Sequence, residues 1–327
     1  MKKLLVLSLM LCSIFTLGLI TQAQAVTWVK GDIFAALIDR VSVYNSTGTF
    51  LESYITGGSN FNTGMGFDFA GNLYVTNFGN NQIAKFTGPN DLHNASLFVN
   101  QAGNPESIAR DLAGNLYISS ASSGDIVKYD TSGNVLKNLH NVGQSNRADW
   151  IEINAANTKL YVTEDIVKGV QILDIATNTK DTALTNSVGN FALRLLPDGT
   201  ILVANSEDVK RLDSSGNVIQ TYDIAGENSW FALNLDPDGT SFWSGNFGSG
   251  KLYKFDIATG GIDNALQTIN TGAGSYSLFG VAIFGEVTQG GGGGDGGGGG
   301  EVPEPATMIL LGSGLAGLWG FRKKFKK

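Results

Sequence analysis

Cysteine is almost absent from the chain, and histidine is scarce. The one cysteine, Cys12, lies in an apolar run near the N-terminus, and the two histidines are His93 and His140. The rest of the chain can therefore form no disulfide and offers no thiolate nucleophile or thiolate metal ligand. Histidine is the usual general base near neutral pH, so its scarcity also disfavours acid-base catalysis.

Charge and catalytic motifs are sparse as well. Charged residues make up 16% of the chain and its net charge is −7, and basic residues at both ends leave the middle more acidic still. Because an acidic surface repels phosphate backbones, we expect no nucleic-acid partner. The sequence contains no Gly-x-Ser-x-Gly elbow, phosphate-binding loop or His-Glu-x-x-His stretch, so no common hydrolase or nucleotide motif is present.

Residues 1–25 predict a secretory signal peptide. Lys2 and Lys3 precede an uncharged apolar run over residues 4–20, and Ala23-Gln24-Ala25 follows this run. Signal peptidase accepts small residues at the positions of Ala23 and Ala25. We therefore expect export by the Sec machinery and cleavage by signal peptidase after Ala25.

The opposite end predicts a linker and a membrane segment. Residues 290–301 are almost all glycine, a composition typical of flexible coil. An uncharged run over residues 306–321 follows; as a helix it would rise about 24 Å, so we expect a short transmembrane helix. The basic residues that are expected to hold its far end in the cytoplasm are Arg322, Lys323, Lys324, Lys326 and Lys327.

The segment 302–327 also has a specific order of parts. Val302-Pro303-Glu304-Pro305 comes first, the Gly-containing apolar run second and the basic cluster last. This order closely resembles the PEP-CTERM sorting signal of Gram-negative bacteria. The resemblance implies an exosortase-type membrane enzyme as a partner, processing near Pro303, Glu304 and Pro305, and an association with exopolysaccharide. It predicts an inner-membrane precursor that reaches the cell surface or extracellular space; the alternatives are an ordinary single-span anchor and a buried helix.

Residues 26–289 contain an internal repeat. Five units align at equivalent strand positions that are 40 to 44 residues apart, namely Tyr74, Tyr117, Tyr161, Leu202 and Phe242. A period of roughly 40–45 residues with about four strands per unit is typical of β-propeller blades. Asp-Gly and Gly-Asn steps between the strands supply the positive φ that tight hairpins need.

The two ends of this body predict how the ring closes. Residues 33–54 have room for three strands, and residues 278–284 form a lone strand after the last unit. Pairing these parts completes a sixth blade and removes two exposed edges. The predicted fold class is an all-β, six-bladed β-propeller with Velcro closure, flanked by the signal-peptide helix and the transmembrane helix.

The repeats resemble the NHL and SMP-30/gluconolactonase group of six-bladed propellers. The motifs that carry this resemblance are Gly71-Asn72-Leu73-Tyr74-Val75-Thr76-Asn77 and Asp236-Pro237-Asp238-Gly239-Thr240. The lactonase-like members imply a divalent ion held in the channel by Glu, Asn and Asp side chains. The residues of suitable type are Glu106, Asp149, Asn190 and Asn205.

Propeller ligands are expected where loops enter the inner strands, at the channel mouth. The residues predicted there are Asn104, Glu106, Arg147, Asp149, Trp150, Asn190, Asn228 and Trp230. Polar groups beside two tryptophans suit a sugar, whose hydroxyls accept and donate hydrogen bonds and whose C–H faces stack on aromatic rings. The alternative is that the tryptophans wedge between blades and the asparagines cap turns.

The predicted function is a non-enzymatic binding or structural propeller at the cell surface or in the extracellular matrix, with exopolysaccharide as a partner. We expect no catalytic residue, no metal and no cofactor. The alternative is a divalent-metal enzyme on the same scaffold, either an SMP-30/gluconolactonase-like hydrolase or a streptogramin-lyase-like enzyme. Fold alone does not separate these functions, because propellers support both.

Overall fold

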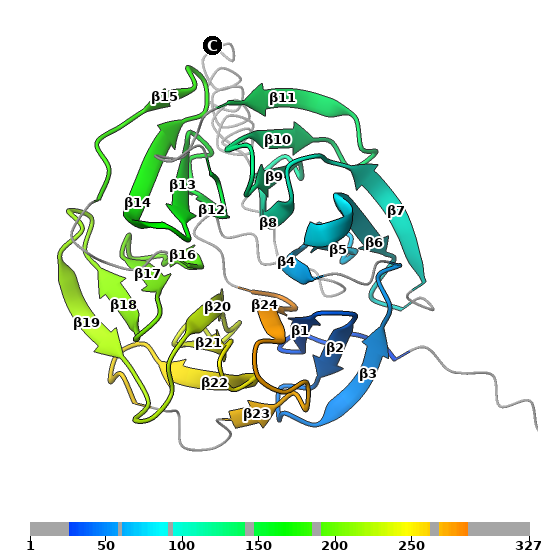
Figure 1. Cartoon of the computed structure of the whole chain (residues 1–327), viewed down its shortest axis with the longest axis vertical. Helices are drawn as coiled ribbons and strands as arrows, with labels where there is room; N and C mark the ends of the chain where they lie inside the picture. Colours follow the sequence, from blue (N-terminus) through cyan, green and yellow to red (C-terminus); the bar gives the residue numbers. More distant parts are fainter. Residues whose placement is uncertain are drawn as a thin grey trace, which may run out of the picture.

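The computed structural model describes residues 26–57, 61–90, 94–140, 147–184, 191–261 and 268–286. Within these residues the chain forms β1 to β24 and one short 3-10 helix, η1 (Phe78–Asn80). The strands make six four-stranded sheets, which stand around a central axis as the blades of a propeller (Figure 1). The predicted all-β, six-bladed propeller is confirmed.

We number the blades in chain order and give their strands from the channel outward. Blade 1 consists of β24 (Leu278–Ile283), β1 (Ile33–Leu37), β2 (Val41–Tyr44) and β3 (Phe50–Tyr54). Blade 2 consists of β4 (Asn62–Phe67), β5 (Leu73–Asn77), β6 (Gln82–Phe86) and β7 (Ala95–Asn100). Blade 3 consists of β8 (Pro105–Arg110), β9 (Leu116–Ser120), β10 (Ile126–Tyr129) and β11 (Val135–Leu139).

The other three blades repeat this order. Blade 4 consists of β12 (Trp150–Ile153), β13 (Lys159–Glu164), β14 (Val167–Asp174) and β15 (Thr179–Lys180). Blade 5 consists of β16 (Leu193–Leu195), β17 (Ile201–Ala204), β18 (Val209–Leu212) and β19 (Val218–Tyr222). Blade 6 consists of β20 (Trp230–Leu235), β21 (Ser241–Asn246), β22 (Lys251–Asp256) and β23 (Thr268–Asn270).

The ring is closed by its two ends, as predicted. β24 pairs antiparallel with β1, with Ile283 opposite Ile33 and Val281 opposite Ala35. Every sheet in the ring is therefore formed by strands between residues 33 and 283. The described residues between 26 and 286 supply every pairing partner of these six sheets.

Several hairpins use one turn, with the sequence Asp-x-x-Gly-Asn. In its clearest example Asp213 Oδ1 accepts the backbone N–H groups of Ser215 and Asn217, each at 2.9 Å, and the Asn217 side chain donates to Asp213 Oδ2. Gly216 supplies φ +83°, which glycine adopts without strain. The same bonds occur at Asp68, Asp111 and Asp130. These Asx turns explain why the Gly-Asn steps mark hairpins.

The core lies between neighbouring blades. Its largest fully buried side chains include Trp28, Trp230 and Trp243. Trp28, which precedes the first strand, donates from Nε1 to the Tyr54 hydroxyl at 2.8 Å and so joins the start of the chain to blade 1. A buried indole N–H needs such an acceptor, because an unmet donor would destabilise the fold.

The predicted signal peptide, linker and C-terminal helix lie outside the described residues. The described part begins at Val26, the first residue after the predicted cleavage point. In the part of the chain that the structure describes, no helix has the length and apolar character to cross a membrane.

Candidate functional site

The innermost strand of each blade lines the central channel (Figure 1). These six strands are β4, β8, β12, β16, β20 and β24. We call the end where they begin the mouth, and the end where they finish the opposite end. Pockets occur at both ends, one lined by residues at strand beginnings and one by residues at strand ends.

The mouth has a rim of residues in the left-handed conformation. Phe61, Asn104 and Ser229 directly precede β4, β8 and β20, and their φ angles are 58°, 57° and 73°. Tyr276, two residues before β24, has φ 60°. Non-glycine residues adopt this conformation at a cost of about 1 kcal/mol or more each, so surrounding contacts must hold them there.

Hydrogen bonds to two blades hold three of the rim residues, Phe61, Asn104 and Ser229. The Asn104 backbone N–H donates to Asn81 Oδ1 of blade 2 at 2.8 Å, and its carbonyl accepts from the Ala121 N–H of blade 3 at 3.0 Å. Phe61 and Ser229 repeat this arrangement with backbone partners in the preceding blade and in their own. The rim therefore joins the loops of successive blades and fixes the residues that follow it.

A cluster of acidic side chains lies just inside this rim. Glu106 of β8, Asp149 before β12 and Asp165 in the turn after β13 place carboxylate oxygens within 4.8 Å of one another. Arg147 binds Asp149 with two contacts, Nη2 to Oδ1 at 2.8 Å and Nε to Oδ2 at 3.1 Å. Arg147 Nη2 also lies 3.8 Å from Asp165 Oδ2. The Asp165 backbone N–H also donates to Asp149 Oδ2 at 2.6 Å.

Burial makes this cluster hard to ionise fully. Burial raises the pKa of Glu106 well above its usual range, and the charges of Asp165 and Asp149 raise it further, while Arg147 opposes them. Burial and the charge of Asp149 raise the pKa of Asp165 to about 7. The three carboxyl groups face only one guanidinium, so the cluster favours a bound proton or a bound cation.

Glu106 carries an unmet acceptor. The residue is only 3% exposed, and its Oε2 accepts no hydrogen bond from any described residue. Asp149 is the side-chain hydrogen-bond partner of Glu106 when one of the two carboxyl groups holds a proton. An acceptor left without a donor would cost about 1–3 kcal/mol, so the pair favours a shared proton or a bound cation. The carboxylate spacing would also fit a divalent ion, held by Glu106, Asp149 and Asp165.

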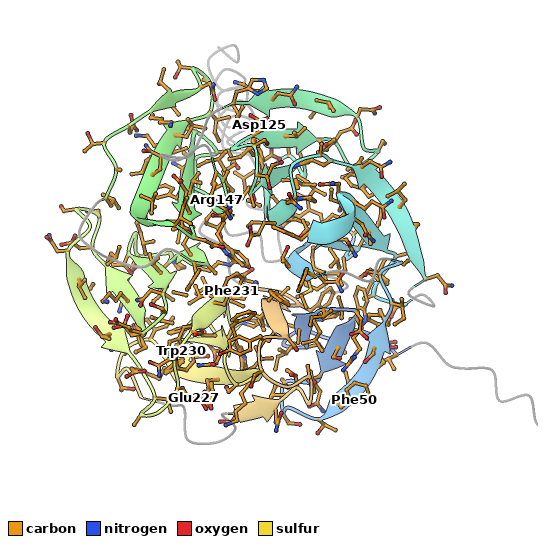
Figure 2. The ribbon with its side chains drawn as sticks, viewed as in Figure 1. Phe50, Asp125, Arg147, Glu227, Trp230 and Phe231 are labelled. Carbon is orange, nitrogen blue, oxygen red and sulfur yellow. The ribbon has the colours of Figure 1, made fainter. Side chains whose placement is uncertain are left out.

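Aromatic rings form the rest of the mouth pocket. The pocket has a volume of about 290 Å³ and is lined by Phe61, Thr63, Phe78, Glu106, Arg147, Asp165, Phe231, Phe247 and Phe279. Phe247 packs against Phe279 with ring centroids 5.1 Å apart and against Phe231 at 5.6 Å. Figure 2 shows Arg147 and Phe231 near the centre of the ring, with Trp230 farther out in its blade. The mouth therefore combines an acidic wall with an apolar, aromatic one.

The structure brings together three of the predicted site residues, Glu106, Arg147 and Asp149. Asn104 lies on the rim, where its side chain donates to the Phe78 carbonyl at 3.0 Å. Asn228 is exposed in the loop before β20, and Asn190 lies outside the described residues. Asn205 caps its own turn by accepting the Glu207 N–H at 2.8 Å.

The two predicted tryptophans occupy a different position from the one expected. Trp150 is 3% exposed and Trp230 is fully buried, so neither ring offers a face to a ligand. Trp230 packs on Tyr253 and Phe255 of its own blade, and Trp150 contacts Phe231 edge to face at a centroid distance of 5.6 Å. This placement corrects the expected stacking role and agrees with the alternative that they wedge between blades.

Sequence reasoning missed Asp165 and the phenylalanines. Asp165 directly follows Glu164 at the end of a strand, and Phe231 directly follows Trp230. The register of β20 shifts between Trp230 and Ala232, which makes Phe231 an extra, unpaired residue in the strand. Simple alternation therefore does not give the direction of Phe231, and the position of Asp165 depends on a hairpin of the next blade.

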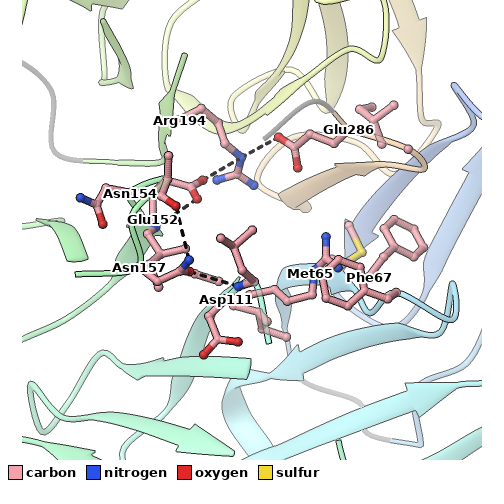
Figure 3. Close-up of a pocket in the computed structure, with 18 residues that line it drawn as sticks. Met65, Phe67, Asp111, Glu152, Asn154, Asn157, Arg194 and Glu286 are labelled. Carbon is pink, nitrogen blue, oxygen red and sulfur yellow. Dashed lines mark hydrogen bonds and ion pairs between the residues drawn. The ribbon is translucent and has the colours of Figure 1, made fainter. Parts of the chain in front are cut away.

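An ion-paired cluster lies at the opposite end of the channel (Figure 3). Arg194 Nε lies 3.0 Å from Glu286 Oε1 and 3.6 Å from Glu152 Oε2. Glu286 also accepts the Leu235 backbone N–H at 2.9 Å. The cavity here is about 80 Å³. Because its charges are paired and its space is small, this end is better suited to stabilising the ring than to holding a ligand.

Histidine contributes nothing to either end in the described residues. His140 is exposed and bonds Asp125 at 3.0 Å beyond the outermost strand of blade 3. His93 lies outside the described residues.

Comparison with known proteins identifies the C-terminal segment and the fold. Residues 301–324 match the PEP-CTERM protein-sorting motif. A comparison with curated protein sequences gave no match. The structure is similar to a chain in a crystal structure of a nidogen/laminin complex, with a TM-score of 0.65, 14% identity, and coverage of 77% of this chain and 97% of that one.

Two further structures are similar. One is a protein of unknown function from Bacteroides caccae, with a TM-score of 0.62, 14% identity, and coverage of 77% of this chain and 98% of that one. The other is hydrazine synthase of Kuenenia stuttgartiensis, with a TM-score of 0.50, 16% identity, and coverage of 61% and 64%. At these identities the likeness concerns the fold alone. The chain is thus a six-bladed β-propeller that carries a C-terminal PEP-CTERM motif, the mark of an exported protein processed at the membrane.

Proposed function

We propose that this protein is a non-enzymatic binding propeller, displayed at the cell surface or in the extracellular matrix after exosortase processing, and that it holds its ligand in the mouth pocket. The mouth pocket is the single observation that carries the proposal. It combines the unmet acceptor of Glu106 with five phenylalanine rings at one end of a rigid ring. Ligand pockets are typically apolar cavities with a few placed polar groups.

Two further features support binding without turnover. The described residues place no histidine near the channel, and the chain has no cysteine beyond Cys12. In the mouth, Arg147 is engaged by Asp149 on two of its nitrogens, which leaves little capacity to stabilise a developing negative charge. Most hydrolytic chemistry needs oxyanion donors as well as a general base.

The proposed partner is an exopolysaccharide of the producing cell. The PEP-CTERM motif supports it through the association of such signals with exopolysaccharide production. Phenylalanine rings at the mouth supply faces on which sugar C–H groups can stack. A single contact of this kind contributes only about 0.5–1.5 kcal/mol beyond area burial, so retention in a matrix would depend on many copies of the protein.

The test is binding of the host polymer to the ring, residues 26–286. Phe247→Leu removes an aromatic face from the mouth but keeps an apolar side chain, and Phe50→Leu makes the same change on the exposed outer strand β3. We expect Phe247→Leu to weaken binding several-fold and Phe50→Leu to leave it unchanged. Equal binding by both variants and the parent would place the ligand elsewhere.

A metal-dependent hydrolase or lyase is the second candidate. The observation in its favour is the carboxylate cluster of Glu106, Asp149 and Asp165, which could hold a divalent ion that polarises a substrate carbonyl. Assay of lactone hydrolysis with added Ca²⁺, Mn²⁺ or Zn²⁺ separates the candidates. Metal-dependent turnover that Glu106→Gln abolishes would replace the binding proposal; we expect no turnover.

A further inference from the structure

The mouth pocket has an unusual combination of walls. The carboxyl groups of Glu106 and Asp165 and the guanidinium of Arg147 line one side, with the fully buried Asp149 behind them, and five phenylalanines line the other. This charge balance disfavours an anionic ligand. Neutral sugar hydroxyls would need free donors as well as acceptors, and the guanidinium, the strongest donor, is already bound to Asp149.

Aromatic rings beside carboxylates form the chemistry that recognises organic cations. The face of an aromatic ring carries negative charge and attracts an ammonium group within about 6 Å of its centroid. A carboxylate adds a charge-assisted hydrogen bond to an N–H donor. This inference rests on the proposed function that the mouth binds the host polymer: we infer that the group of the polymer that the mouth recognises is a protonated primary amine on an apolar stem.

Each part of such a ligand would have its own contact in the mouth pocket. The ammonium group would donate to Glu106 Oε2, the buried oxygen that accepts no hydrogen bond from any described residue. Its positive charge would offset the acidic excess of the cluster. The apolar stem would lie along Phe231, Phe247 and Phe279, whose rings pack edge to face or tilted against one another at centroid distances of 5.1 to 6.2 Å.

The same walls fit a divalent metal ion less well. Calcium takes roughly six to eight oxygen ligands at about 2.3–2.6 Å. Beyond the three carboxyl groups, the pocket lining offers Thr63 and phenylalanine rings, and Arg147 brings a positive charge within 3.8 Å of Asp165. A volume of about 290 Å³ lies at the small end of ligand pockets, which start at roughly 300 Å³, and suits one functional group of a larger molecule.

The experiment is titration of the ring, residues 26–286, with n-butylammonium chloride at constant ionic strength, followed by calorimetry or NMR. n-Butanol serves as the neutral probe of similar shape. We expect saturable, weak binding of n-butylammonium and none of n-butanol. Equal binding of both probes, or no saturable binding of either, would overturn the inference.

Two pairs of variants, each a mouth variant with a control elsewhere, test whether n-butylammonium binds at the mouth. Glu106→Gln should weaken n-butylammonium binding about tenfold, whereas Glu152→Gln, at the opposite end of the channel, should not change it. Phe247→Leu should weaken it about two- to fivefold, because the ring face is lost while the apolar volume is kept, and Phe50→Leu should not. Unchanged binding in both mouth variants would contradict the assignment.

Two further results separate this inference from the proposed function. Calcium that binds the ring and excludes n-butylammonium at equal ionic strength would assign the cluster to a metal ion instead. Binding of host polymer that Phe247→Leu weakens, but that persists after acetylation of the polymer's amines, would keep the proposed function and reject the amine as its ligand.

Discussion

Gly280 of β24 lies directly against the backbone carbonyl of Thr63 on β4. A Cβ atom added to Gly280 would fall 1.9 Å from that oxygen, and one added to Gly64 would fall 2.3 Å from the carbonyl oxygen of Glu106. The inner strands of blades 1, 2 and 3 therefore approach one another through glycines. This approach sets the spacing at the mouth, because Glu106 belongs to the third of these strands.

We predict that Gly280→Ala destabilises the ring by about 1–3 kcal/mol, because the added methyl group must displace backbone on β4. Denaturant unfolding of residues 26–286 measures the change. Gly261→Ala is the matched control, since its Cβ would meet only Thr259 Oγ1 at 3.6 Å. Equal stability of the two variants would mean that the strands separate without cost.

Removal of β24 should prevent folding of the ring. A chain that ends at residue 277 exposes the edge of β1 and loses the buried side chains of Leu278, Val281 and Ile283. At about 1.5–3 kcal/mol for each buried side chain, the loss approaches the net stability of a whole domain. We expect an aggregated product; a soluble product with a cooperative thermal transition would refute the role of β24 in closure.

The pH dependence of stability should reveal Glu152 at the opposite end. Burial raises its pKa from an ordinary value near 4.5 to about 7, although Arg194 opposes the shift. Between these pH values the unfolded chain releases a proton that the folded chain keeps. The contribution of Glu152 to the free energy of unfolding therefore falls as pH rises from 4.5 to 7. Over this pH range, the free energy of unfolding of Glu152→Gln should fall by up to about 3 kcal/mol less than that of the parent protein.

Chemical denaturation at several pH values measures that slope. Arg194 keeps Glu286 as a partner in this variant, so the fold should survive. A parent and a Glu152→Gln variant with the same slope between pH 4.5 and 7 would show that Glu152 ionises normally in the folded protein.

The sorting prediction concerns the C-terminal motif. Replacement of Pro303, Glu304 and Pro305 by alanine should leave an unprocessed, membrane-retained form in a host that has exosortase, because these residues lie in the matched motif. Immunoblotting of membrane and released fractions measures it, with Asp295→Gly in the glycine linker as the control. Normal size and release of the triple variant would restore the simple membrane anchor.

Much of the fold follows from local signals in the sequence. The spacing of Tyr74, Tyr117 and Tyr161 reflects one blade per unit, and the Asp-x-x-Gly-Asn turns carry their own hydrogen bonds. The closing strand was predicted at residues 278–284 and β24 spans Leu278–Ile283, because an unpaired apolar strand must find an edge.

The site could be predicted only in part. Glu106, Arg147 and Asp149 were placed at the mouth because they lie near the start of inner strands. The direction of Trp230 depends on which side of β20 meets the core, and Asp165 reaches Glu106 only after two blades pack together. Long-range packing of this kind leaves no mark in the local sequence pattern.

The most direct test of the central claim is amide hydrogen exchange of residues 26–286 with and without the host polymer. If the mouth holds the ligand, exchange should slow in the loops around residues 61–63, 165 and 247, and stay unchanged at residues 152–157 and 283–286 of the opposite end. Protection that appears only at the opposite end or on the outer strands would contradict the account.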